Sequence, residues 1–139
     1  GVDVMKVEIP VNMKFVEGSA SYTGQAAYGK AEALDHFRMA AAAATKPFIY
    51  LSAGVSNEEF TESLEMAAQS EVQWAGVLCG RATWKNGIPV YAKDGVDAFR
   101  RWLETEGTTN IGNVNERLQA ASSWFATYGV TSADALAAE

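Results

Sequence analysis

The chain has 139 residues, of which 48% are hydrophobic and 20% are charged, and its formal net charge is -6. This size and composition fit one globular domain, and no apolar run reaches the ~18 residues that a membrane-spanning helix requires. The acidic balance argues against nucleic acid as a partner, because the phosphate backbone binds basic surfaces.

The first predicted element is a strand over residues 2–9, within the stretch GVDVMKVEIP. Its apolar run ends at Pro10 and is typical of a strand buried in a parallel sheet. Lys6 stands inside this run, and burial of an ammonium is costly unless the charge is paired or its pKa falls. Three interpretations stay open: a buried structural ion pair with Glu8, a lysine at the strand edge whose ammonium snorkels to water, and a nucleophilic lysine that forms a Schiff base.

The elements that follow alternate between helix and strand. The pattern predicts a loop over 12–28, a helix over 30–44, a strand over 48–52, a helix over 57–69 that starts at a capping box, a strand over 72–79, a loop over 81–89, helices over 92–105 and 113–127 separated by Gly107, and a tail over 131–139 that frays or adds a turn. This order predicts an α/β fold with a parallel sheet covered by helices. Three strands form either a small sheet of their own or the last part of an eight-stranded barrel.

Small and polar residues follow the second and third predicted strands. Ser52 and Gly54 come after one, and Gly80 and Arg81 come after the other. In parallel α/β folds ligands bind at the carboxyl ends of the strands, and barrels often hold a phosphate in the last two loops. Glycine amides, a hydroxyl and a guanidinium all donate to phosphate oxygens, although each motif alone is more often an ordinary turn.

Three stretches together carry a family resemblance. VDVMKVEIPVNMKFVEG, PFIYLSAGVS and GVLCGRATW resemble the C-terminal part of the tagatose 1,6-bisphosphate aldolase family in order and spacing. The resemblance implies a (βα)8 TIM barrel, of which residues 1–139 form one partial domain with about strands six to eight and their helices. It also implies a class I lyase that cleaves tagatose 1,6-bisphosphate through a Schiff base on Lys6. The family's phosphate-binding elements fall on Ser52, Gly54, Gly80 and Arg81.

The resemblance also implies the partners of the site. The ligand is a phosphorylated ketose, no cofactor or metal is needed because the protonated imine is the electron sink, and the acid/base carboxylate is expected upstream of Gly1. One histidine, His36, and one cysteine, Cys79, agree with the lack of a His/Cys metal site and of an internal disulfide, and with the cytoplasm. A homo-oligomer is compatible with this interpretation, whereas nucleic acid and membranes are not expected partners.

Three alternatives stay open: an aldolase for a related sulfosugar phosphate, a non-catalytic sugar-phosphate module, and a structural piece without a ligand. A chain that begins at Gly1 inside a strand, without methionine, is expected to be the end of a longer protein. In that case the residues that face the barrel interior lack partners. We expect these to include Val4, Val7, Ile49 and Val77.

Overall fold

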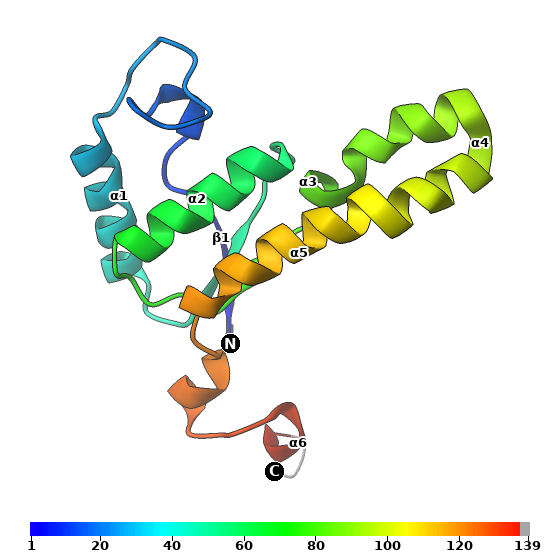
Figure 1. The fold of residues 1–139 in the computed structure, drawn as a ribbon. Helices are drawn as coiled ribbons and strands as arrows, with labels where there is room; N and C mark the ends of the chain where they lie inside the picture. Colours follow the sequence, from blue (N-terminus) through cyan, green and yellow to red (C-terminus); the bar gives the residue numbers. More distant parts are fainter. Residues whose placement is uncertain (137–139) are drawn as a thin grey trace.

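The computed structural model describes residues 1–136 and contains a three-stranded parallel sheet (Figure 1). The strands β1 (Met5–Glu8), β2 (Phe48–Leu51) and β3 (Val77–Leu78) lie in the order β1-β2-β3. The predicted α/β class and the parallel pairing are therefore confirmed. β3 is shorter than predicted because Gly76, at φ 140°, interrupts the regular ladder just before it.

Two helices follow the first two strands and agree with the sequence pattern. They are α1 (Lys30–Ala43) and α2 (Asn57–Gln69). The Ser56 hydroxyl accepts a hydrogen bond from the Glu59 amide at 3.1 Å, as the capping box predicts. The predicted loop over 12–28 holds one 3-10 turn, Met13–Phe15, and is otherwise irregular.

The chain after β3 departs from the prediction. The expected loop over 81–89 is wrong, because α3 (Arg81–Trp84), a 3-10 turn (Lys85–Gly87) and the start of α4 (Ile88–Trp102) occupy it. The predicted break at Gly107 is also wrong: a π-helical segment (Leu103–Gly107) leads directly into α5 (Thr108–Arg117). Gly107 is buried under the Leu103 side chain, so packing compensates for its low helix propensity.

The reversal of direction occurs at Gly95 instead. Its φ of 81° divides α4 into two helices, and the chain folds back there as a hairpin (Figure 1). The predicted helix over 113–127 is likewise wrong, since helical structure continues only through a 3-10 turn at Leu118–Ala120. A second 3-10 turn (Trp124–Tyr128) and α6 (Ala133–Leu136) follow, while residues 137–139 of the predicted tail lie outside the described part.

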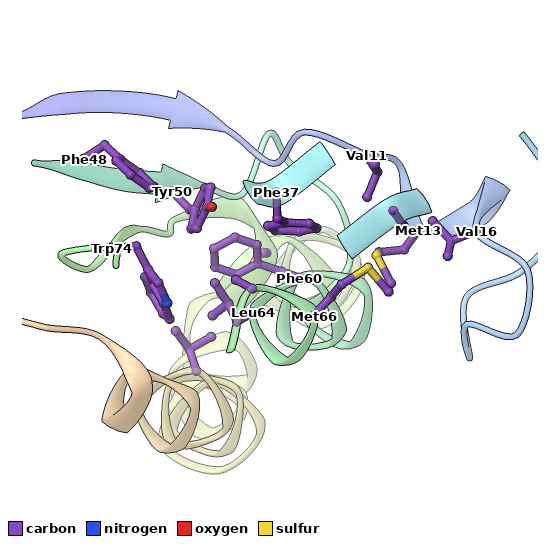
Figure 2. Close-up of a cluster of buried hydrophobic side chains, with 14 residues drawn as sticks. Val11, Met13, Val16, Phe37, Phe48, Tyr50, Phe60, Leu64, Met66 and Trp74 are labelled. Carbon is purple, nitrogen blue, oxygen red and sulfur yellow. The ribbon is translucent and has the colours of Figure 1, made fainter. Parts of the chain in front are cut away.

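The core lies between one face of the sheet and the helices. Figure 2 shows Phe48 and Tyr50 of β2 directed from the sheet toward the helix layer. Burial of each large apolar side chain contributes about 1.5–3 kcal/mol, which fixes the sheet against α1, α2 and α5. The largest fully buried side chains are Trp74, Tyr50, Phe37, Phe60, Met13, Leu64 and Val16.

The opposite face of the sheet has no covering layer among residues 1–136. The register aligns Lys6 with Ile49, and Leu51 with both Glu8 and Leu78, so these side chains share that face. Lys6 and Glu8 are exposed and Leu78 is 53% exposed. We call this set, Lys6, Glu8, Ile49, Leu51 and Leu78, the uncovered face.

Val7 and Val77, which were expected to face the barrel interior, lie instead on the face of the sheet that the helices cover. Val7 and Val77 both align with Tyr50, whose side chain is buried against the helices. Because side chains alternate along a strand, Val7 and Val77 pack into the helix-covered core rather than onto the uncovered face. Ile49 lies on the uncovered face by the same register, so it lacks the covering partners that the prediction said would be missing.

Candidate functional site

Lys6 lies on the uncovered face, in the middle of β1. It is exposed, so the expectation of a buried ammonium is wrong for residues 1–136. The alternative ion pair is wrong as well, because in this part of the chain neither Lys6 nor Glu8 forms a salt bridge or a side-chain hydrogen bond. The apolar sequence around Lys6 reflects the burial of its odd-numbered neighbours against the helices.

A tight turn follows β2 at its carboxyl end. The Val55 amide donates to the Ser52 carbonyl at 3.1 Å, and the two residues between them have positive φ angles, 49° at Ala53 and 81° at Gly54. Left-handed conformation at both central positions is the pattern of a type I′ turn. Within residues 1–136 the amides of Ala53 and Gly54 donate to no backbone or side-chain acceptor, so both are available to a ligand.

Arg81 packs onto this turn from the carboxyl end of β3. A Cβ atom on Gly54 would lie 2.9 Å from the guanidinium carbon of Arg81, so the side chain rests directly on the glycine. Gly80 precedes Arg81 with φ -124° and ψ -87°, which aims the chain from β3 into α3. The structure therefore brings Gly54, Gly80 and Arg81 together, as the sequence predicts for neighbouring parallel strands.

A second cation, which the sequence analysis missed, reaches the same turn. The Lys85 ammonium donates to the Gly54 carbonyl at 2.8 Å. Arg81 and Lys85 lie one helical turn apart, and the Lys85 amide donates to the Arg81 carbonyl. The spacing of four residues was the available signal, because it places both side chains on one face of a helical segment.

Ser52 is less open to a ligand than its neighbours. It is 6% exposed, and its amide donates to the Leu78 carbonyl at 3.3 Å. Burial raises the pKa of the Cys79 thiol, and the Ser52 hydroxyl, which hydrogen-bonds the sulfur, partly opposes that rise. Ser52 thus links the ends of β2 and β3, with its hydroxyl engaged by Cys79.

The charges around the turn favour an anion. In the described part of the chain Arg81 and Lys85 form no ion pair, although both approach Gly54. Like charges four residues apart on a helix repel each other, so an anion that neutralises both would be bound favourably. Two free amides next to two unpaired cations suit a phosphate group.

Other acidic groups nearby are already engaged or exposed. The Glu59 carboxylate, 7% exposed, pairs with the Lys14 ammonium at 3.6 Å. Glu62 accepts hydrogen bonds from the Ala20 and Ser21 amides and thereby ties the loop over 12–28 to α2. Among residues 1–136 no group of three or more His, Cys, Asp or Glu side chains could hold a metal ion, and no helix is long and apolar enough to cross a membrane.

Comparisons of the chain with known proteins show the family to which it belongs. Residues 1–86 match the family described as DeoC/LacD family aldolase. The chain is 50% identical over 130 residues to a tagatose 1,6-diphosphate aldolase of Listeria monocytogenes, a match that covers 93% of this chain and 38% of that protein. A tagatose 1,6-diphosphate aldolase of Staphylococcus aureus is 52% identical over 124 residues, covering 88% of this chain and 37% of its own. The chain thus spans less than two fifths of these relatives and belongs to the DeoC/LacD family of aldolases.

Proposed function

We propose that this chain is the C-terminal part of a class I aldolase that cleaves tagatose 1,6-bisphosphate. The observation that carries the proposal is the turn at Gly54, where two free amides and two unpaired cations meet at the carboxyl ends of neighbouring strands. Lys6 lies on the adjoining strand, on a face that residues 1–136 leave uncovered. The names of the relatives support the choice of substrate.

In this proposal the three strands are strands six to eight of a (βα)8 TIM barrel, and residues 1–139 are one partial domain. A parallel sheet is normally covered on both faces, whereas here one face is bare and β1 and β3 have no outer neighbour among residues 1–136. Preceding strands that close a barrel would cover that face and both edges. Lys6 would then lie inside the barrel.

The mechanism assigns bond formation to Lys6. Its neutral amine attacks the ketose carbonyl at C2, and loss of water gives a protonated imine. The C3–C4 bond breaks as its electron pair moves into the iminium, while the C4 hydroxyl loses a proton, so glyceraldehyde 3-phosphate leaves and an enamine remains. Protonation and hydrolysis then release dihydroxyacetone phosphate. The carboxylate that moves the protons is assigned to a strand before Gly1, and no metal is required.

The phosphate of the dihydroxyacetone portion is assigned to Gly54, Gly80 and Arg81, with Ser52 as a further candidate. Amide donors and a guanidinium stabilise the phosphate by charge-assisted hydrogen bonds, and they hold the carbonyl carbon within reach of the lysine. A cytoplasmic location accords with Cys79 as a free thiol.

The deciding experiment traps the imine in the full-length protein. Borohydride reduction with dihydroxyacetone phosphate should leave a stable adduct, and peptide mapping should place it on Lys6. An adduct on another lysine would contradict the assignment. No adduct together with retained phosphate binding would favour the non-catalytic sugar-phosphate module.

A further inference from the structure

We propose that Lys85 is a positioning residue that locks the phosphate-binding turn after β2; this inference rests on the proposed function. The half-buried Lys85 ammonium donates to the Gly54 carbonyl at 2.8 Å, across 31 residues of sequence. The Gly-Arg motif and the family resemblance assign phosphate binding to Arg81, whereas the hydrogen bond from Lys85 to the Gly54 carbonyl is found only in the three-dimensional structure.

The backbone conformation of this turn is energetically unfavourable, so it has to be held in place by contacts with the rest of the chain. Ala53 has a φ of 49°, in the left-handed region. This backbone conformation is energetically unfavourable for any residue that carries a Cβ atom. Such a conformation persists where surrounding contacts fix it. Two contacts do so here: the hydrogen bond from the Val55 amide to the Ser52 carbonyl at 3.1 Å, and the bond from Lys85 to Gly54.

The position of Lys85 is itself fixed by neighbouring helices. The Thr83 carbonyl in α3 accepts a hydrogen bond from the Asn110 side-chain amide of α5 at 2.9 Å. The Asn110 carbonyl accepts one from Asn57, the first residue of α2, at 3.0 Å. α3 is therefore tied to both α5 and the start of α2, and Lys85 follows it directly.

The free amides of Ala53 and Gly54 depend on this arrangement. If the Gly54 carbonyl loses its donor, Ala53 can relax toward the right-handed region, and the amides of Ala53 and Gly54 then change direction with the backbone. The packing of the Arg81 guanidinium against Gly54 would be lost at the same time. Lys85 therefore acts through the turn, and its loss should weaken phosphate binding more than the loss of one distant charge would.

The test compares Lys85→Met with Lys93→Met, an exposed lysine of α4, in the full-length protein. Inorganic phosphate is titrated by calorimetry at low salt and at about 1 M KCl, where charges beyond ~3 Å are screened. Lys85→Met should weaken phosphate binding about tenfold at both salt concentrations, as expected for a lost charge-assisted hydrogen bond. Lys93→Met should bind phosphate like the unmodified protein.

Two outcomes would overturn the inference. One is a phosphate affinity of Lys85→Met within about twofold of the unmodified protein. The other is a loss that disappears at high salt, which would make Lys85 a distant charge only. If Lys85→Met does not fold, Lys85→Gln, which keeps the position polar but lacks the charge, is held to the same two criteria.

Kinetics then separate this inference from the proposed function. Lys85→Met should raise KM for tagatose 1,6-bisphosphate while kcat changes little, and Lys85→Arg should recover most of the affinity. If dihydroxyacetone phosphate is trapped on Lys6 but phosphate binding does not depend on Lys85, the inference fails and the aldolase function stands. If no adduct forms, the function fails, and the phosphate titration alone decides the role of Lys85.

Discussion

Gly54 and Arg81 fit against each other so closely that a methyl group on the glycine would lie 2.9 Å from the guanidinium carbon. Gly54→Ala should therefore displace Arg81 and also strain the backbone, which has a φ of 81°. We expect KM for tagatose 1,6-bisphosphate to rise about tenfold or more, with a loss of about 1 kcal/mol of stability. Steady-state kinetics and a thermal melt of the full-length protein measure the two effects.

Gly24→Ala is the matched control. Gly24 has a φ of 83°, but nothing lies within 4 Å of its Cβ position. It therefore shares the backbone strain without the contact, and it should lose stability with KM unchanged. Equal KM values for the two variants would contradict a role of the contact between Gly54 and Arg81.

Removal of the Lys6 amine should abolish cleavage. In the full-length protein Lys6→Ala should lower kcat by about four orders of magnitude or more, because the proposed mechanism assigns imine formation to the Lys6 amine. Lys6→Arg should do no better, since a guanidinium does not add to the carbonyl. Lys93→Ala serves as the control for a general loss of positive charge. Near-normal turnover of Lys6→Arg would exclude the Schiff-base mechanism.

Loss of the Arg81 guanidinium should act mainly on substrate binding. Arg81→Ala should raise KM about tenfold to a hundredfold for tagatose 1,6-bisphosphate and affect kcat less, because the phosphate is bound in both the ground state and the transition state. Arg101→Ala, an exposed arginine of α4, should leave both parameters unchanged. The assignment is contradicted if Arg81→Ala lowers kcat alone.

The parallel pairing of the strands could be predicted from local patterns in the sequence, whereas the expectation that consecutive strands are neighbours came from the family resemblance. Apolar strands alternating with helices predict parallel pairing, and because β2 and β3 are neighbours in the sheet, the residues that follow them lie close together. The contact of Arg81 with Gly54 follows from that topology.

Lys85 and the hairpin at Gly95 could not be predicted in the same way. The four-residue spacing of Arg81 and Lys85 places both side chains on one face of a helical segment, but it does not reveal that the Lys85 ammonium donates to a carbonyl 31 residues away. Gly95 and Gly107 look alike as helix breakers, but only tertiary packing distinguishes them, because Gly107 is buried beneath Leu103 while Gly95 has open space around it. The exposure of Lys6 was missed because neighbours directed toward the helices made its strand look buried throughout.

The Tyr50 hydroxyl makes stability depend on pH in the alkaline range. Burial raises the pKa of Tyr50 to about 12, and within residues 1–136 its hydroxyl has no hydrogen-bond partner. Between pH 10 and 12 the unfolded chain loses this proton while the folded chain keeps it. This group therefore leaves the free energy of unfolding unchanged below pH 10 and lowers it by about 2 to 3 kcal/mol as the pH rises toward 12.

Tyr50→Phe should remove this part of the alkaline loss. Because the hydroxyl is buried without a partner, the variant should be at least as stable as the unmodified protein at neutral pH. Urea unfolding of the full-length protein at pH 8 and pH 11 measures both effects, with the exposed Tyr91→Phe as control. A Tyr50→Phe variant that loses as much stability at pH 11 as the unmodified protein would show that another group titrates.

The uncovered face should determine how residues 1–139 behave when produced alone. Parallel sheets are covered on both faces in stable proteins, and here Ile49, Leu51 and Leu78 lie on a face with no covering layer among residues 1–136. The outer edges of β1 and β3 are also unpaired in this part of the chain, and such edges pair with other chains. We therefore expect concentration-dependent self-association in sedimentation experiments, and no aldolase turnover.

Leu78→Lys tests whether the uncovered face drives this association. A charge on that face should reduce self-association of residues 1–139, whereas Met39→Lys, at an apolar position on α1 that is 62% exposed, should not. Supplying the preceding strands as a separate chain should cover the face, restore a defined assembly and return activity, because closure of the proposed barrel would bury Lys6 and complete the proposed site. A monodisperse monomer of residues 1–139 that cleaves tagatose 1,6-bisphosphate by itself would show that the covering strands are dispensable, and the barrel assignment would then be wrong.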